Sequence, residues 1–471
     1  MARVFLPPRP VPAWAPVAAG LVLLLVWVGW LLAPVRTPVD LRVPGRDRPA
    51  GESAAGEVQD AFAKATVVAG PGKPAAIPGA WPRFRGAGFD GVQRDAKSLT
   101  RAWGSAGPKT LWSVEVGEGF AGPAVDGGRV YLMDYDRERQ RDALRCLSLE
   151  DGAEIWRFSY PMAVKRNHGL TRTVPCVANG RVVAMGPKCH VVAVDARTGA
   201  FAWGLDLARD FGTTVPPWYA GQCPWVDGDV VVLAPGGAEA LLMGVDIRTG
   251  KVSWKTPNPR GWKMTHASVV PMDWDGGRWY LYPASGGIAA VDAKDGSLAW
   301  DSTVWKINIA TVPTPVVLGE GRVFLTGGYG AGSMLLQFRR VDGKLDATPV
   351  WRVKPDVFGA TQHTPVWDGR HLYGIRADGR LVCLGLDGKV VWAGDAGATF
   401  GLGPLMMADG LILALSEGGR LDAVEASPDG YRRLASASIL EAHEAWAPLA
   451  LAGERLLARD LTRMVCLDLG R

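Results

Sequence analysis

From about residue 80 onward, short apolar runs of strand length alternate with tight turns built on Gly beside Asp, Asn or Glu. The runs are rich in Val, Leu, Ile and aromatic residues, which favour strands, and Gly supplies the positive φ that such turns need. This turn-and-strand unit occurs eight times, as VDGGRVYLM, ANGRVVAM, VDGDVVVL, WDGGRWYLY, GEGRVFLT, WDGRHLYGI, ADGLILAL and AGERLLAR. The pattern predicts an all-β fold of many short antiparallel strands.

A second motif, V-D-x-x-T-G-x-x-x-W or a close variant, recurs between these units. Three copies are VDARTGAFAW, VDIRTGKVSW and VDAKDGSLAW, which end at Trp203, Trp254 and Trp300. Asp or Thr can cap the turn, Gly takes positive φ, and Trp supplies a large ring to bury against a neighbour. The repeat Trp positions are 112, 156, 203, 254, 300, 351 and 392, with spacings of 44, 47, 51, 46, 51 and 41 residues. A period of about 40–50 residues carrying four strands is typical of a β-propeller blade.

The two ends of the repeat region complete one blade. The chain finishes with TRMVCLDLGR, a third strand without a fourth, and the cycle begins with KTLWSVEVG, a fourth strand without a third. Pairing these strands would leave no open sheet edge. The sequence therefore predicts an eight-bladed β-propeller of four-stranded antiparallel blades over residues 81–471, closed by its N- and C-terminal strands.

Residues 14–33, WAPVAAGLVLLLVWVGWLLA, contain no charge and would span about 30 Å as a helix. Trp14 and Trp30 lie near the two ends, where indole rings favour the membrane interface. The sequence predicts one N-terminal transmembrane helix, an uncleaved signal anchor, after a short tail of residues 1–13. Residues 34–80 contain seven prolines and many Gly and Ala. This composition predicts a linker that holds the propeller away from the membrane.

The V-D-x-x-T-G-x-x-x-W units resemble the repeats of pyrroloquinoline quinone (PQQ)-like, quinoprotein-type β-propellers. That superfamily includes quinoprotein alcohol dehydrogenases and BamB, the outer-membrane assembly lipoprotein. The stretches WPRFRGAGFDGV, VGEGFAGPAV and LAPGGAEALLMGVDIRTGKVSW are more similar to the BamB-type PQQ-repeat proteins of planctomycete-type bacteria. The resemblance covers about residues 81–471 and implies the fold. It leaves the function open, because this fold hosts both enzymes and scaffolds.

The orientation in the membrane depends mainly on this resemblance. Arg3 and Arg9 precede the apolar segment and four arginines follow it between residues 36 and 48, so the charge count does not decide. The resemblance implies a cytoplasmic N-terminus and an exported body. We therefore expect a single-pass protein of the cell membrane with its propeller on the periplasmic or extracytoplasmic side.

Candidate binding residues concentrate in the connections from the fourth strand of one blade to the first strand of the next. These connections open on one face of a propeller, beside its central channel. They contain His168, Gln222, His266, His363 and His443. We expect this face to bind a protein or an envelope polymer. No two His have the spacing of metal ligands, so no metal site is predicted.

The resemblance also implies an alternative, a PQQ- and calcium-dependent dehydrogenase acting on an alcohol or sugar. PQQ carries three carboxylates on a flat quinone, and its calcium ion takes oxygen ligands beside a catalytic Asp. Parts of such a site are offered by Arg172, Trp218, Lys263, Asn308, Glu444 and Trp446. The chain lacks the adjacent Cys pair of many quinoprotein dehydrogenases and an attached cytochrome motif, and no Asp stands out as a base. We therefore expect a non-catalytic scaffold without a tightly held cofactor.

Charge and cysteine content narrow the choice further. The formal net charge is +5, and Lys and Arg alternate with Asp and Glu, so no basic stripe predicts nucleic-acid binding. The six Cys include no C-x-x-C pair. Cys146, Cys383 and Cys466 fall at one repeat position, where small apolar residues also occur. We expect them to be buried as such, with a disulfide as the open alternative.

Overall fold

The computed structural model describes residues 14, 20–21, 23–25, 27–28 and 61–470. The chain divides into two units, Met1–Arg46 and Asp47–Arg471. Among the described residues, no helix has the length and apolar character that crossing a bilayer requires. The anchor expected at 14–33 lies mostly outside the described residues, and the tail 1–13 and linker residues 34–60 lie wholly outside them. These three assignments stay predictions.

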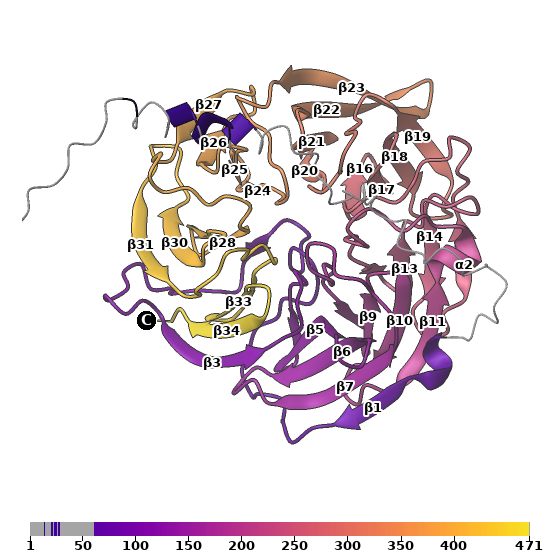
Figure 1. Cartoon of the computed structure of the whole chain (residues 1–471). Coiled ribbons are helices and arrows are strands. Elements are labelled where there is room, and N and C mark those ends of the chain that lie inside the picture. Colours follow the sequence, from indigo (N-terminus) through magenta and orange to yellow (C-terminus); the bar gives the residue numbers. More distant parts are fainter. Residues whose placement is uncertain (1–13, 15–19, 22, 26, 29–60, 471) are drawn as a thin grey trace, which may run out of the picture. The chain divides into compact units, whose positions relative to one another are not determined.

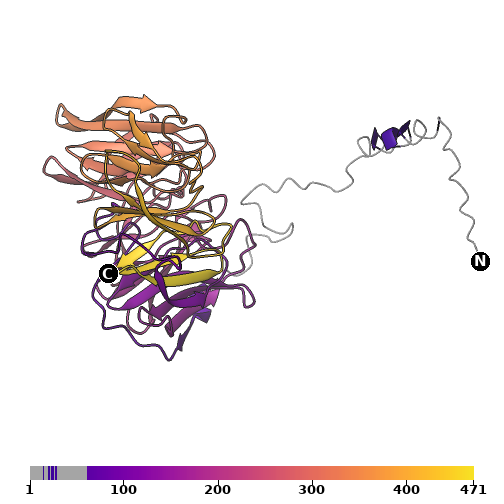
Figure 2. The ribbon, with the colours of Figure 1, turned by 90° about the vertical axis from the view of Figure 1, so that its left-hand side faces the viewer.

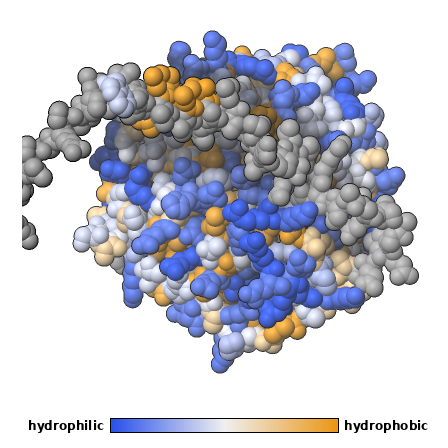
Figure 3. All heavy atoms as spheres, viewed as in Figure 1, coloured by the Kyte–Doolittle hydropathy of each residue, from blue (hydrophilic) through white to orange (hydrophobic). Residues whose placement is uncertain are grey.

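Residues 61–470 form an eight-bladed β-propeller, which confirms the predicted architecture (Figure 1). Eight separate sheets surround a central channel, and each contains a core of four antiparallel strands. Within this core of four strands, the innermost strand comes first in the chain and the outermost comes last, except in the eighth blade. On the face shown in Figure 3, hydrophilic side chains are spread around the ring with smaller hydrophobic patches among them.

The first four blades follow one another in the chain and share the same strand order. The first blade contains β4 (Ala124–Asp126), β5 (Arg129–Asp136), β6 (Arg141–Ser148) and β7 (Glu154–Pro161), and the second contains β8 (Cys176–Ala178), β9 (Arg181–Met185), β10 (His190–Asp195) and β11 (Phe201–Asp206). The third contains β12 (Trp225–Asp227), β13 (Val230–Leu233), β14 (Met243–Asp246) and β15 (Val252–Lys255), and the fourth contains β16 (Val270–Trp274), β17 (Gly277–Ala284), β18 (Gly287–Asp292) and β19 (Leu298–Ser302). A short helix, α2 (Leu207–Phe211), follows the second blade.

The remaining blades repeat this order and end with the ring closure. The fifth blade contains β20 (Val316–Gly319), β21 (Arg322–Gly327), β22 (Gly332–Val341) and β23 (Lys344–Val353), and the sixth contains β24 (Val366–Trp367), β25 (Leu372–Ile375), β26 (Leu381–Leu384) and β27 (Val390–Ala393). The seventh contains β28 (Leu405–Ala408), β29 (Leu411–Leu415), β30 (Arg420–Glu425) and β31 (Arg433–Ser438), and the eighth contains β32 (Ala450–Ala452), β33 (Arg455–Arg459), β34 (Arg463–Asp468) and β3 (Lys109–Glu115).

The core lies within and between the blades, because each sheet is covered on both faces by its neighbours. β29 is buried at all five positions, although alternate residues of a strand point to opposite faces. This explains why the middle strands read as continuous apolar runs and not as alternating ones. All six cysteines, each within residues 61–470, are buried and free, so the disulfide alternative is not realised.

The repeated Trp and the repeated turn Gly meet across the blade boundaries. Nε1 of Trp156, in the first blade, donates a hydrogen bond of 3.3 Å to the carbonyl oxygen of Ala196, in the second. Gly199, in the same turn as Ala196, has φ of 72°, and a Cβ there would lie 2.7 Å from the Trp156 ring. This position therefore requires Gly for two reasons: its φ is positive, and the Trp156 ring occupies the space where a Cβ would lie. The repeat is architectural, as the sequence predicted.

The ring is closed by its ends, as predicted. β3 pairs antiparallel with β34, with Trp112 opposite Cys466. The yellow C-terminal strand accordingly lies beside purple N-terminal strands in both views (Figures 1 and 2). This pairing gives the eighth blade its fourth strand and leaves no unpaired edge at the closure.

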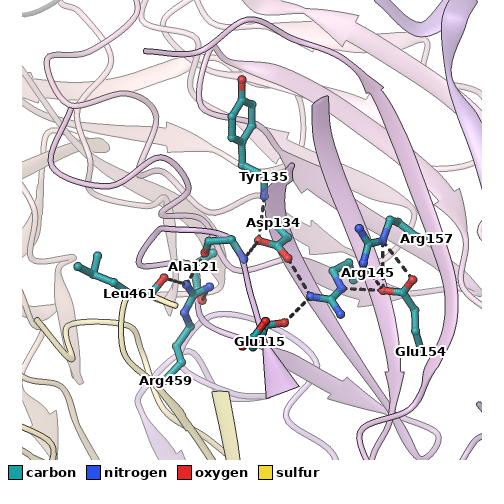
Figure 4. Close-up of polar contacts among 10 residues, drawn as sticks. Glu115, Ala121, Asp134, Tyr135, Arg145, Glu154, Arg157, Arg459 and Leu461 are labelled. Carbon is teal, nitrogen blue, oxygen red and sulfur yellow. Dashed lines mark hydrogen bonds and ion pairs between the residues drawn. The ribbon is translucent and has the colours of Figure 1, made fainter. Parts of the chain in front are cut away.

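A buried polar network joins the closing blade to the first blade (Figure 4). Arg145 on β6 forms ion pairs with Asp134 at 3.0 Å and Glu154 at 2.7 Å, and donates to the carbonyl oxygen of Glu115 on β3 at 2.9 Å. Arg459 on β33 is fully buried and donates to the carbonyl oxygens of Gly117, Ala121, Asp460 and Leu461. Burial lowers the pKa of Arg459 to about 10, so it stays charged at neutral pH. These bonds cross the seam where the two chain ends meet.

The propeller begins earlier in the chain than the predicted boundary at residue 81. A 3₁₀ turn, η1 (Ala61–Lys64), leads into β1 (Thr66–Ala69), which pairs antiparallel with β7 and covers the outer edge of the first blade. Backbone N–H groups of Gly70, Gly72 and Ala75 then donate to this blade. The strand TVVA was missed because the Pro and Gly around it favour a linker. Residues 61–80 are therefore part of the propeller unit.

Candidate functional site

A segment of 14 residues, 81–94, crosses the centre of the ring, and we call it the channel plug. Trp81 exchanges two backbone hydrogen bonds with Val125 in the first blade, at 2.8 and 2.9 Å. The Phe89 ring packs edge-on against Trp225 in the third blade, with centroids 5.0 Å apart. Val92, in β2 (Val92–Gln93), then pairs in parallel with Met407 in the seventh blade. The plug thus spans the ring and forms the floor of a cavity on one side.

Arg85 holds the plug in place. This buried guanidinium donates hydrogen bonds to four carbonyl oxygens, those of Phe89 (3.0 Å), Asp90 (2.7 Å), Thr364 (2.9 Å) and Pro365 (2.8 Å). Two of these acceptors lie in the plug itself and two beside the sixth blade. Burial lowers the pKa of Arg85 to about 10, so the side chain stays charged at neutral pH. The charge is satisfied by carbonyl dipoles, as a buried ion must be.

The cavity between the plug and the blade connections has a volume of about 350 Å³. Its aromatic lining residues are Trp81, Phe84, Phe120, Trp218, Tyr329 and Trp446. Its ionisable side chains, besides Tyr329 and Cys223, are two arginines, Arg85 and Arg172, and three histidines, His168, His266 and His363. None of the residues that line it is a carboxylate. The cavity is therefore apolar and aromatic, with positive charge in its walls.

Arg172 is the charged group that stands out in this wall. Its guanidinium carbon lies 5.5 Å from the centroid of the Phe120 ring, which stacks on Trp446 at 4.9 Å and an angle of 24°. Nη2 donates to the carbonyl oxygens of Asn167 and His168, at 3.1 and 2.5 Å, whereas Nη1 has no hydrogen-bond partner within the described chain. Arg172 forms no ion pair with any carboxylate of residues 61–470. Burial lowers its pKa to about 10, so the charge persists at neutral pH.

Two histidines of the cavity are held neutral. Burial lowers the pKa of His266 to about 4, and the charge of Arg172 acts in the same direction. Burial likewise lowers the pKa of His363 to about 4, and its Nε2 lies 3.3 Å from the carbonyl oxygen of Ile375. At neutral pH both rings add polarity but no charge. Arg85 and Arg172 therefore carry positive charge in the cavity wall, whereas these two histidines do not.

The backbone is strained where Trp218 enters the cavity wall. Trp218 and Tyr219 both have positive φ, of 61° and 71°, which bulky residues rarely adopt. The Tyr219 hydroxyl donates a 2.7 Å hydrogen bond to the carbonyl oxygen of Lys165, and the Trp218 ring lies 6.2 Å from that of His266. Strain of this kind persists where the surroundings fix a side chain in place, and it is frequent at binding sites.

The structure brings together about half of the residues proposed from the sequence. Arg172, Trp218 and Trp446 line the cavity, as do His168, His266 and His363. Lys263 and Asn308 are exposed outside it, and Glu444 is only partly buried and does not line it. Gln222 lies in the core, bonded to Ala234, and His443 is exposed. The plug residues Trp81, Phe84 and Arg85 were missed as site residues.

The lining residues do not match a calcium-bound PQQ site. Calcium takes six to eight oxygen ligands, for which proteins supply mainly carboxylates. Gln362 is the one side-chain amide of the lining, which contains no Asp, Glu or Asn. Across the described residues, no group of three or more His, Cys, Asp or Glu could hold a metal. A tricarboxylate would also find few free donors, because four of the five N–H donors of Arg85 already bind carbonyl oxygens.

Known proteins share this fold. A family model described as "Outer membrane protein assembly factor BamB" matches residues 140–344. BamB of Vibrio cholerae is 28% identical over 171 residues, 35% of this chain and 39% of that protein. BamB of Shewanella oneidensis is 21% identical over 276 residues, 54% of this chain and 65% of that protein. The chain thus spans less than two thirds of each of these relatives.

Two solved structures extend the comparison to most of the chain. BamB from Moraxella catarrhalis superposes with a TM-score of 0.51 at 16% identity, covering 76% of this chain and 99% of that one. Quinohemoprotein alcohol dehydrogenase from Comamonas testosteroni superposes with a TM-score of 0.58 at 12% identity, covering 83% of this chain and 81% of that one. At these identities the likeness concerns the fold alone. The fold is an eight-bladed β-propeller, and the comparisons show that it is similar to PQQ-like propellers. Among such propellers, this one resembles BamB.

Proposed function

We propose that this protein is a non-catalytic binding scaffold of the cell envelope, which presents the cavity face of its propeller to a protein partner. One observation carries the proposal: the cavity walls contain aromatic rings and arginines but no carboxylate. Dehydrogenation of an alcohol needs a base beside the substrate, and the two histidines of pKa about 4 are weak bases. A binding surface needs no such group.

The resemblance to BamB supports the same role. The relatives are named as outer membrane protein assembly factors, which is a role in the assembly of proteins and not in the oxidation of a small molecule. In this chain the apolar segment 14–33 would anchor the propeller to the cell membrane, with the ring on the periplasmic or extracytoplasmic side. Exposed residues of this face, among them His168 in a blade connection and Tyr329 in the turn between β21 and β22, would then face the partner.

Site-specific photo-cross-linking in the native cell tests this proposal. A photoreactive amino acid replaces His168 or Tyr329 at the cavity mouth, or Arg370 as the control. Arg370 is equally exposed but lies in a first-to-second hairpin turn, on the opposite face. We expect discrete cross-links to an envelope protein from the two cavity-face positions and none from Arg370. Cross-links from Arg370 alone, or from none of the three, would contradict the proposal.

A further inference from the structure

The cavity wall contains a partly exposed charge that no carboxylate of residues 61–470 neutralises. Arg85 and Arg172 both line it, but their surroundings differ. All of the polar neighbours of Arg85 are in place, since it donates to four carbonyl oxygens. Arg172 donates through Nη2 only, and its Nη1 has no partner in the described chain. Arg172 is partly exposed and lines a cavity without carboxylates, so an anion bound in the cavity would supply the counter-charge that the chain does not.

The surroundings of Arg172 also specify the shape of such an anion. Phe120 stacks on Trp446 and lies under the guanidinium, so an aromatic surface runs directly beside the charge. Aromatic rings interact favourably with further rings that stack on them with an offset or meet them edge-on, so this surface favours a ligand with a flat ring over an aliphatic chain. The volume of about 350 Å³ lies within the range of small-molecule pockets.

The wall accommodates one negative charge and not several. His266 and His363 contribute no charge at neutral pH, and four of the five N–H donors of Arg85 already bind carbonyl oxygens, so Arg85 offers little to a second carboxylate. We propose that the central cavity is a binding site for a planar aromatic monocarboxylate, with its carboxylate on Arg172 and its ring against the Phe120–Trp446 pair. This site shares its cavity with the proposed scaffold face, but the inference rests on Arg172, Phe120 and Trp446 and does not require a protein partner.

The dependence of binding on the ligand's charge can be tested with a series of ligands that share one naphthalene ring. Purified full-length protein in detergent is titrated by calorimetry at pH 7.5 with 2-naphthoate, 2-naphthamide and naphthalene-2,6-dicarboxylate, and with PQQ plus calcium. We expect 2-naphthoate to bind at least tenfold tighter than the neutral amide or the dicarboxylate, and to change the tryptophan fluorescence. Equal affinity for the amide, no binding of the naphthoate, or tighter binding of the dicarboxylate or PQQ would overturn the proposal.

A matched pair of variants then locates the site. Arg172→Gln removes the charge in the wall, whereas Arg166→Gln removes one from the same connection that is exposed and paired with Glu118 at 2.6 Å. We expect Arg172→Gln to weaken naphthoate binding at least tenfold, to the level of the amide, and Arg166→Gln to leave it unchanged. Unchanged binding in a folded Arg172→Gln variant would overturn the assignment. Should that variant not fold, the ligand series above still decides. Cross-linking from His168 reports on the scaffold role separately.

Discussion

The indole Nε1 of Trp203, in the second blade, donates a 2.8 Å hydrogen bond to the carbonyl oxygen of Ile247, in the third. The same ring covers Gly250, where a Cβ would lie 2.7 Å from it. Asp246 completes the turn by accepting from the backbone N–H and the hydroxyl of Thr249. The two conspicuous parts of the repeat, the turn and the Trp, are therefore two halves of one contact between successive blades.

Replacing Trp203 should destabilise the folded protein strongly. Trp203→Ala removes a buried ring and leaves a cavity between blades, so we expect it to lower the free energy of unfolding by about 3–5 kcal/mol. Trp254 occupies the same repeat position but is only half-buried, so Trp254→Ala should cost less. Urea unfolding followed by circular dichroism measures both. Losses below about 1 kcal/mol for Trp203→Ala would show that the ring does not hold the blades together.

The turn Gly should be sensitive for two separable reasons. Gly250 and Gly180 have similar φ, of 73° and 70°, but a Cβ at Gly250 meets the Trp203 ring whereas one at Gly180 meets nothing within 4 Å. Gly180→Ala thus measures the cost of positive φ alone, about 1 kcal/mol. We expect Gly250→Ala to lower the melting temperature further. Equal effects of the two substitutions would mean that the ring moves away freely.

Ring closure should depend on the last strand. Deleting residues 463–471 removes β34 and unpairs β3 and β33, which exposes two apolar sheet edges. We expect aggregation or a large fall in the melting temperature. Deleting residues 1–60 serves as the control, because it leaves every strand of residues 61–470 in place. A melting curve unaffected by the C-terminal deletion would place the closure elsewhere.

A buried carboxyl between the first and second blades should make stability depend on pH. Asp142 is fully buried near Tyr160, His190 and Lys188, and burial raises its pKa to about 7. The unfolded chain releases this proton near pH 4, so between about pH 4 and pH 7 the folded state holds the extra proton. Stability contributed by the protonated carboxyl is therefore complete below about pH 4 and is lost as the pH rises through 7.

The substitution Asp142→Asn isolates this effect. The amide does not titrate, so at pH 8 the variant should be more stable than the parent, by up to roughly 3–4 kcal/mol, with little difference at pH 4. Asp229→Asn, at an exposed carboxyl paired with Arg248, is the control and should change little. Urea unfolding across pH 4–8 gives the comparison. Parallel pH profiles for the parent and Asp142→Asn would rule out this role.

The sequence predicts the ring well because its determinants are local and repeated. Turn Gly and strands rich in β-branched residues recur in every blade, the repeat Trp recurs in seven of the eight, and even the closure follows from counting strands. The channel plug is different, because its contacts connect distant parts of the chain: Arg85 bonds to Thr364, 279 residues away. No periodic pattern marks such a residue. The signal that was present was a stretch rich in Gly, Arg and Phe ahead of the first blade.

The candidate site was predictable as a set of loops but not as a set of residues. Connections between blades were correctly placed around the channel, and Arg172 and Trp446 do line the cavity. Lys263, in an equivalent connection, does not, because the path of each loop decides which side chain turns inward. That path depends on tertiary contacts such as the strained backbone at Trp218.

The central claim is that this propeller is a binding module and not a quinone enzyme. The most direct test is titration of PQQ and calcium into the purified full-length protein, with the quinone absorbance and dye-linked oxidation of alcohols and sugars as readouts. The account predicts neither a bound-quinone spectrum nor oxidation above that of the buffer with PQQ and calcium. Oxidation that requires PQQ and is lost in Arg172→Ala would contradict it and make the cavity an active site.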